Sequence, residues 1–219
     1  MIVLGIETAT QICSAALVDD QGLLAETRLN VKNIHARKLP VIISDLVRAV
    51  DIELKDIDGI AVSIGPGSFT GLRIGLATAK GLAMAGDIPV TTVPTLLVLA
   101  RQIPVDSGTI AAVLQSRKDE YYIAVYERRQ NRDNCVQDVQ VVNGKQAIAM
   151  LPTGAWVTGQ IENLNLNHKL SVVKSLPGAH HVAQLGLEQL ENNNIQPLDT
   201  LEPLYHQEFI AGKPKKPVV

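Results

Sequence analysis

The sequence is poor in aromatic residues and carries almost no net charge. Phe, Trp and Tyr make up 3% of the 219 residues, so the chain offers no row of aromatic rings on which single-stranded bases could stack. The formal net charge of −2 gives no sign of the basic surface by which proteins hold nucleic-acid phosphates. Both absences argue against a stand-alone nucleic-acid-binding module.

Cysteines and long apolar runs are also scarce. The two cysteines, Cys13 and Cys135, lie far apart, which is typical of reduced thiols rather than of a disulfide framework. No Cys and His residues have the spacing of a zinc site. The short apolar start of the chain meets Glu7 and has no basic flank, so it is neither a signal peptide nor a membrane span. We therefore expect a soluble cytoplasmic protein.

The first part of the chain alternates between strand and helix patterns. Short β-branched runs predict strands, and apolar residues at steps of three and four predict helices. The expected strands cover 2–6, 12–20, 23–31, 60–64 and 88–93, and the expected helices cover 35–50, 69–85 and 94–100. Three strands followed by alternating helices and strands predict an α/β domain with a mixed sheet.

After Pro104 the pattern is weaker. We expect strands at 109–114, 121–127, 139–142, 155–159 and 170–173, helices at 145–151 and 181–190, and a loop at the segment NRDN, 131–134. A boundary near residue 103 then divides the chain into a lobe at 1–103, a smaller lobe at 104–211 and a disordered tail at 212–219.

A glycine-rich turn between a strand and a helix is the most distinctive local feature. Gly65-Pro66-Gly67 precedes Ser68, a residue type that favours the N-cap of a helix. Helix N-termini bind phosphates, but no P-loop lysine follows and the spacing is not that of a dinucleotide-binding turn. A structural turn is therefore favoured, and Gly65 and Gly67 are weak candidates for holding a phosphate.

Glu7 is the acidic candidate that would accompany such a phosphate site. It follows the first strand beside the hydroxyl residues Thr8 and Thr10, where a carboxylate can face a metal-bound nucleotide. An ordinary turn explains the same residues and is favoured on spacing alone.

The histidines and hydroxyl residues supply no catalytic set. We interpret His35 as a surface or capping residue, and His180 and His181 as part of a solvated first helical turn. No Ser, Cys or Thr lies in a nucleophile motif, and Ser68 does not fit Gly-x-Ser-x-Gly.

The helix expected after the glycine-rich turn carries a ridge of small residues. Gly71, Gly75, Ala79 and Ala83 recur at every fourth position and share one face. Each glycine inside a helix costs roughly 1 kcal/mol relative to alanine, so a close approach to another element should compensate. That element is either the protein's own sheet or a helix of a partner, and spacing cannot distinguish the two.

Four segments together resemble the TsaB (YeaZ) family, bacterial proteins needed to make threonylcarbamoyladenosine in tRNA. They are LGIETATQICSAAL, HARKLPVIISDLV, DGIAVSIGPGSFTGLRIGLATAKGLA and IPVTTVPTL. Near the end, PLYHQ resembles the family's Pro-x-Tyr ending, with His206 where leucine is common. The resemblance implies an α/β chain with the actin-like ATPase (ASKHA) fold, in which two lobes each contain a mixed β-sheet flanked by helices.

The resemblance also implies a chain without catalysis of its own. The related transferase TsaD holds a metal through two histidines, and here Thr95 and Leu99 stand at those positions. Leucine has no donor atom, so we expect no metal site. We expect no catalytic residue and no cofactor in this chain, although a nucleotide at an interface shared with TsaD stays open.

The partners follow from the same resemblance. The helices expected at 35–50 and 69–85 would pair with the equivalent helices of TsaD, or with a second copy of the chain as a homodimer when it is alone. The implied interface residues are Leu39, Ile43, Leu46, Val50, Gly71, Leu72, Arg73, Gly75, Leu76, Ala79 and Ala83. The implied function is a scaffold that activates TsaD and helps to recruit the ATPase TsaE, while TsaC supplies threonylcarbamoyl-adenylate.

Two other functions stay open. The first is an ATP-dependent phosphotransferase or peptidase-like enzyme of the same fold, which needs acidic residues from both lobes around a metal-bound nucleotide. The second is a module that binds tRNA directly, for which Lys213, Lys215 and Lys216 in the tail could contact phosphates. The neutral charge argues against the second, so tRNA is expected to be reached only through the complex.

Overall fold

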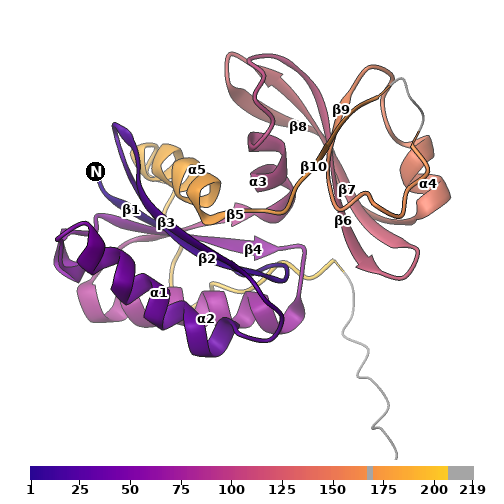
Figure 1. Cartoon of the computed structure of the whole chain (residues 1–219). Helices are drawn as coiled ribbons and strands as arrows, with labels where there is room; N and C mark the ends of the chain where they lie inside the picture. The colour runs from indigo at the N-terminus through magenta and orange to yellow at the C-terminus, as the bar shows by residue number, and fades with distance from the viewer. Residues whose placement is uncertain (167–169, 207–219) are drawn as a thin grey trace, which may run out of the picture.

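The computed structural model describes residues 1–166 and 170–206, which form two lobes (Figure 1). The first lobe is built on a five-stranded sheet of the order β3-β2-β1-β4-β5. Its strands are β1 (Val3–Glu7), β2 (Ile12–Asp19), β3 (Gly22–Asn30), β4 (Gly59–Gly65) and β5 (Val90–Pro94). β1 pairs antiparallel with β2 and parallel with β4, so the predicted mixed sheet is confirmed.

Helices α1 (His35–Ala49) and α2 (Phe69–Gly86) cover one face of the first sheet (Figure 1). Leu39, Ile42 and Leu46 point into the core because their spacing places them on one side of α1. The predicted order of strands and helices in this part of the chain is confirmed. The 3₁₀-helix at Leu54–Asp56 was not expected from the sequence.

The second lobe contains a five-stranded sheet of the order β10-β9-β6-β7-β8. Its strands are β6 (Gly108–Arg117), β7 (Glu120–Arg129), β8 (Arg132–Asn143), β9 (Trp156–Gly159) and β10 (Ser171–Lys174). Helix α3 (Thr95–Arg101) packs Leu96 and Leu99 against this sheet, and the short α4 (Gly144–Ala149) follows β8.

The loop expected at 131–134 is wrong. β8 begins at Arg132 and pairs with β7 from its first residue, so the strand is far longer than the expected 139–142. Gln130 and Asn131 have φ values of 50° and 62°, and two such residues close a tight hairpin. The charged segment around them hid the strand because its side chains are mostly exposed.

The last helix and the segment after it return to the first lobe. α5 (Ala179–Glu191) covers the face of the first sheet opposite α1 and α2, packing Val182 and Ala183 against it (Figure 1). Gly5 of β1 permits this contact, because a Cβ there would overlap the backbone of Ala179 and Ala183. Residues 196–206 then pass along β5 and β4, with hydrogen bonds from Gln196 N to Val90 O (2.8 Å) and from Leu204 N to Ile64 O (2.9 Å).

The expected division at residue 103 therefore differs from the structure. Chain order placed 176–206 in the second lobe, whereas these residues cover the first sheet. α3, which was expected in the first lobe, packs chiefly on the second. Residues 207–211 and the tail at 212–219, with its lysines, lie outside the described residues.

A cluster of charged side chains, which we call the interlobe clasp, joins the lobes. Its members are Arg101, Arg128, Asp133 and Glu188. Arg101 binds Asp133 of β8 (Nε to Oδ2, 2.8 Å) and also Glu188 of α5, so it connects the second sheet to the helix on the first. Arg128 is 3% exposed and donates to Asp133 Oδ1 (2.7 Å).

Among residues 1–166 and 170–206, no helix is both long and apolar enough to cross a bilayer.

Candidate functional site

The glycine-rich turn ends β4 and begins α2 as predicted. The Ser68 hydroxyl accepts a hydrogen bond from Gly71 N at 3.1 Å, which confirms Ser68 as the N-cap. Ser68 N itself donates to Ala9 O at 2.6 Å. Two of the N–H groups that a phosphate would need are therefore already bound within the protein.

The glycines of this stretch make room for the protein's own β1–β2 turn. A Cβ at Gly67 would overlap Ala9 O, and a Cβ at Gly71 would overlap Thr8 O. A Cβ at Gly75 would meet the Thr8 hydroxyl. Residues 8 and 9 therefore occupy the space beside these three glycines.

The small-residue ridge of α2 is therefore an internal surface. Gly71 and Gly75 face Thr8, and Ala79 and Ala83 are buried in the core of the first lobe. Of the two possibilities that spacing left open, packing within the protein is the one that the structure contains.

Most of the residues expected at a partner interface are buried in the same way. Val50 is half-buried, and Arg73 alone of the eleven is exposed. The buried apolar members are Leu39, Ile43, Leu46, Leu72 and Leu76. In the isolated chain these residues pack inward, because the apolar side of an amphipathic helix lies on the helix's own sheet.

The opposite side of α2 carries a second stripe, which we call the outer face. It consists of Arg73, Ala77, Gly81 and Met84, all exposed and about one helical turn apart. Met84 is 77% exposed, and a Cβ at Gly81 would meet no atom within 4 Å. On the adjacent α1, Val41 is 47% exposed. The outer face is thus open, flat at Ala77 and Gly81, and apolar at one end.

Glu7 is enclosed and does not face a ligand site. Its carboxyl is 0% exposed, and Oε1 accepts a hydrogen bond from Ala9 N at 2.5 Å. Burial raises the pKa of Glu7 to about 7, and the hydrogen bond from Ala9 limits the rise. Glu7 therefore holds the β1–β2 turn in the shape that fits against α2.

Replacing Glu7 by glutamine should change how stability depends on pH. The folded pKa of about 7 lies above the ordinary value of 4.5, so the stabilising effect of this proton is complete below pH 4.5 and is lost as the pH rises through 7. When the pH is raised from about 5 to about 8, the free energy of unfolding of the parent should fall by up to about 3 kcal/mol more than that of Glu7→Gln. Urea unfolding at both pH values measures this.

Glu53→Gln is the matched control for that experiment, because the Glu53 side chain is 72% exposed. The control should follow the parent at both pH values. Equal pH dependence in the parent and Glu7→Gln would contradict the assignment of a buried, protonated Glu7.

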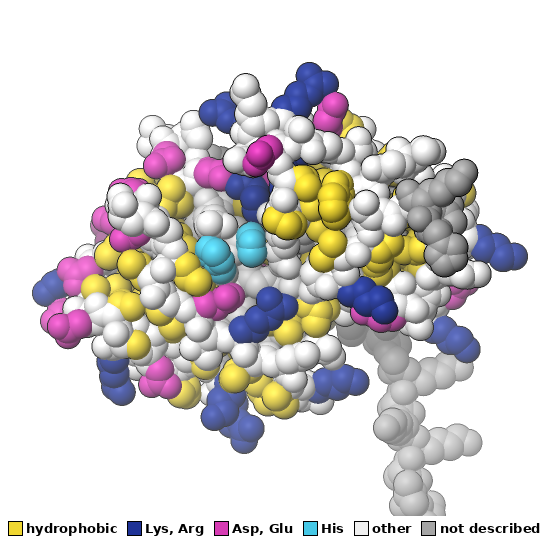
Figure 2. Space-filling view, turned by 45° about the horizontal axis from the view of Figure 1, so that its top comes forward, with side chains coloured by type: hydrophobic (Ala, Val, Ile, Leu, Met, Phe, Trp, Pro, Cys, Tyr) yellow, Lys and Arg dark blue, Asp and Glu magenta, His cyan; other side chains and the backbone are white. Residues whose placement is uncertain are grey.

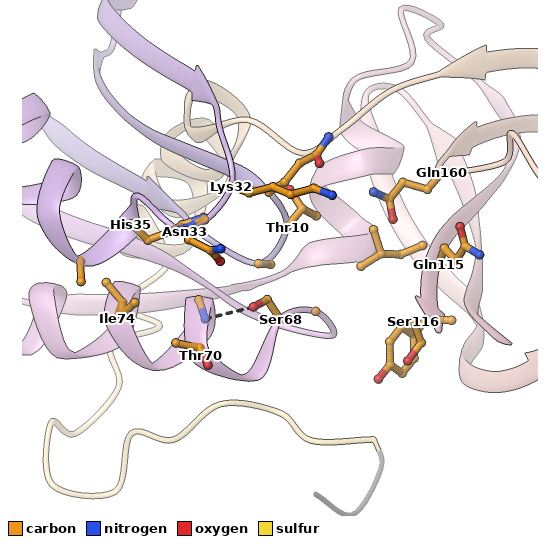
Figure 3. Close-up of a pocket in the computed structure, with 17 residues that line it drawn as sticks. Thr10, Lys32, Asn33, His35, Ser68, Thr70, Ile74, Gln115, Ser116 and Gln160 are labelled. Atoms are coloured by element: carbon orange, nitrogen blue, oxygen red, sulfur yellow. Dashed lines mark hydrogen bonds between the residues drawn. The ribbon is translucent and has the colours of Figure 1, made fainter. Parts of the chain in front are cut away.

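A cleft of about 550 Å³ separates the two lobes beside the glycine-rich turn. Thr10, Lys32 and Ser68 reach it from the first lobe, and Gln115 and Gln160 face them from the second (Figure 3). None of the described residues that line it is Asp or Glu. Gly67 lines the cleft, whereas Glu7 and Gly65 do not.

The two positions that correspond to metal-binding histidines lie inside the protein. The Thr95 hydroxyl is hydrogen-bonded to the Ser63 hydroxyl at 2.9 Å, and Leu99 packs in the core of the second lobe. Among residues 1–166 and 170–206 no cluster of three His, Cys, Asp or Glu side chains could hold a metal ion.

The three histidines that were expected to be solvent-exposed are less exposed than predicted. His35 is buried, with Nε2 3.0 Å from Ile12 O. His180 and His181 are half-buried, with ring centroids 4.9 Å apart, and burial lowers the pKa of His181 to about 4. Histidine side chains are visible near the middle of the face in Figure 2, between groups of charged side chains.

The fold and the enclosed turn define the class of protein. YeaZ from Pseudomonas aeruginosa superposes with a TM-score of 0.83 at 24% identity, covering 93% of this chain and 99% of that one. The activator of the 2-hydroxyisocaproyl-CoA dehydratase from Clostridium difficile superposes with a TM-score of 0.54 at 7% identity, covering 94% and 100%. The chain has the two-lobed actin-like ATPase (ASKHA) fold.

Sequence comparison gives the family. Residues 24–184 match the family model of TsaD, tRNA N6-adenosine threonylcarbamoyltransferase. The tRNA threonylcarbamoyladenosine biosynthesis protein TsaB of Escherichia coli K12 is 29% identical over 97% of this chain and 97% of its own length. The chain belongs to the TsaD-like family and is a TsaB (YeaZ) member of it.

Proposed function

We propose that this chain is a non-catalytic subunit of the machinery that makes threonylcarbamoyladenosine next to the anticodon of tRNA in the cytoplasm. It binds and activates the transferase TsaD and helps to recruit the ATPase TsaE. The observation that carries the proposal is the division of α2, whose inner side is filled by Thr8 while the outer face stays open at Gly81.

The outer face suits a helix of a partner. Ala77 and Gly81 have almost no side chain, so a second helix can approach the backbone of α2 closely. Met84 adds exposed apolar area at the end of the outer face, where burial on binding is favourable. We propose that the equivalent helices of TsaD pack here, and that a second copy of this chain takes the same place when TsaD is absent.

The cleft supports a binding role over an enzymatic one. An ATP-dependent phosphotransferase or a related hydrolase needs carboxylates around its metal-bound nucleotide, and the described lining of the cleft has none. Glu7, the acidic candidate, is enclosed and bound to Ala9. We therefore place any nucleotide of the complex, and the tRNA, at surfaces shared with TsaD.

Mixing the purified chain with TsaD of the same organism should give co-elution in size-exclusion chromatography and a higher tRNA modification activity. Ala77→Glu should abolish both, because it places a charge and a long side chain on the flat part of the outer face. Ala149→Glu is the matched control, since Ala149 is also an exposed helical alanine but lies on α4 of the second lobe. Unchanged co-elution of the Ala77→Glu chain would contradict the proposed docking surface.

A further inference from the structure

The C-terminal segment delivers an aromatic side chain to the start of the outer face. Leu198 and Leu201 anchor it in the core of the first lobe, and Leu204 N donates to Ile64 O at 2.9 Å. Gly65 has a φ of +116°, and a Cβ there would lie 2.9 Å from Leu204 O. The backbone of the segment is thus fixed against the glycine-rich turn immediately before Tyr205.

Tyr205 and Phe69 together hold the Arg73 side chain in one position. The Phe69 and Tyr205 rings lie 5.1 Å apart, and the guanidinium carbon of Arg73 is 3.8 Å from the Phe69 ring centre. Arg73 Nε donates to the Tyr205 hydroxyl at 2.9 Å. We call these three residues the arginine clamp. A long side chain that would otherwise sample many rotamers is ordered here before any partner binds.

The clamp leaves part of the guanidinium available. Nε binds Tyr205, and within residues 1–166 and 170–206 no carboxylate forms an ion pair with Arg73. Arg73 is exposed and lies one turn before Ala77 on the outer face. A planar guanidinium with free N–H groups matches the two oxygens of a carboxylate, and arginine is enriched among the residues that dominate interface energies.

We propose that the arginine clamp is an anchor that takes an Asp or Glu carboxylate of the partner helix seated on the outer face. This inference rests on the proposed function and adds the chemistry of the contact. The clamp lies on the same stripe as Ala77 and Gly81, so a partner helix that covers those residues passes directly beside it. The ordered guanidinium sets which end of the partner helix binds there and adds specificity to a surface that is otherwise small and apolar.

The test is the equilibrium dissociation constant for TsaD, measured with the parent chain and with Arg73→Lys. Lysine keeps the charge but cannot bind a carboxylate with two parallel hydrogen bonds, so affinity should fall about tenfold, while thermal stability stays unchanged. The affinity of Tyr205→Phe for TsaD should fall about threefold. The affinity of the double variant should fall by less than the product of the two single reductions, because both changes act on the contact made by the Arg73 side chain. Arg129→Lys, at an exposed arginine of the second lobe, is the control and should bind as the parent does.

Three results would overturn the inference. If Arg73→Lys bound TsaD as tightly as the parent, Arg73 would not be an anchor for a carboxylate. If Ala77→Glu still abolished binding in that case, the proposed function would stand without the arginine clamp. Equal losses of affinity in Tyr205→Phe and Arg73→Lys would make the clamp a packing feature. The third result concerns Glu208, which lies outside the described residues. If Glu208→Gln weakens TsaD binding as much as Arg73→Lys, and the two changes together weaken it no further, the carboxylate that Arg73 binds belongs to this chain.

Discussion

Gly71→Ala should destabilise the protein by about 2–3 kcal/mol, whereas Gly81→Ala should leave it unchanged or stabilise it by up to about 1 kcal/mol. Both glycines lie in α2, and alanine is the better helix former at each. The difference arises from what the added methyl group meets. At Gly71 it overlaps Thr8 O, a backbone atom of the β1–β2 turn, whereas at Gly81 it enters open space.

Chemical denaturation of the two variants and the parent gives the comparison directly. Because the substitution and the helix are the same, the intrinsic helix preference cancels and the difference reports the contact with Thr8. Equal stability of Gly71→Ala and Gly81→Ala would show that the β1–β2 turn does not press against α2 in solution.

Arg128→Met should lower the free energy of unfolding by about 3–5 kcal/mol, which is a larger effect than that of Gly71→Ala. Arg128 is almost fully buried and donates to Asp133 and to the carbonyl groups of Ala100 (2.7 Å) and Ile103 (2.5 Å). Removing the guanidinium leaves the two carbonyl groups and Asp133 Oδ1 without this donor in a place that water does not readily reach. Methionine keeps much of the volume, so the loss reports the polar contacts rather than a cavity.

Arg129→Met tests the adjacent residue under the same conditions. Arg129 is 73% exposed and its ion pair with Glu127 lies at the surface, so the change in stability should be within about 0.5 kcal/mol. Thermal and urea unfolding of both variants are the measurements. An Arg128→Met chain as stable as Arg129→Met would contradict the interlobe clasp as a structural element.

The sequence predicted most helices and strands, with β8 and the 3₁₀-helix at Leu54–Asp56 as exceptions, but it did not predict what packs against them. The spacing of Leu39, Ile42 and Leu46 predicted α1 and its buried side, because the core of one lobe is large enough to select a helix face. The same spacing could not say whether Gly71 and Gly75 meet the chain's own turn or a partner. Both arrangements require small residues, and only the position of Thr8 decides between them.

Three other contacts could not be predicted from any pattern in the sequence. The return of α5 to the first sheet depends on a contact between Gly5 and Ala179, which are far apart in the chain. Two members of the interlobe clasp, Arg128 and Asp133, lie in a charged segment around residues 127–133, where the buried Arg128 cannot be distinguished by sequence from the exposed Arg129. Tyr205 was visible as part of the family's ending, yet its contact with Arg73 follows only from the path of residues 196–206.

The most direct test of the account compares the dissociation constants of Ala77→Glu and Ala149→Glu for TsaD. The central claim is that α2 uses its inner side for folding and its outer face for binding. It predicts that affinity falls at least about 100-fold, or about 2.7 kcal/mol, for Ala77→Glu alone, while both variants unfold like the parent. Parent-like affinity of Ala77→Glu for TsaD would contradict the claim.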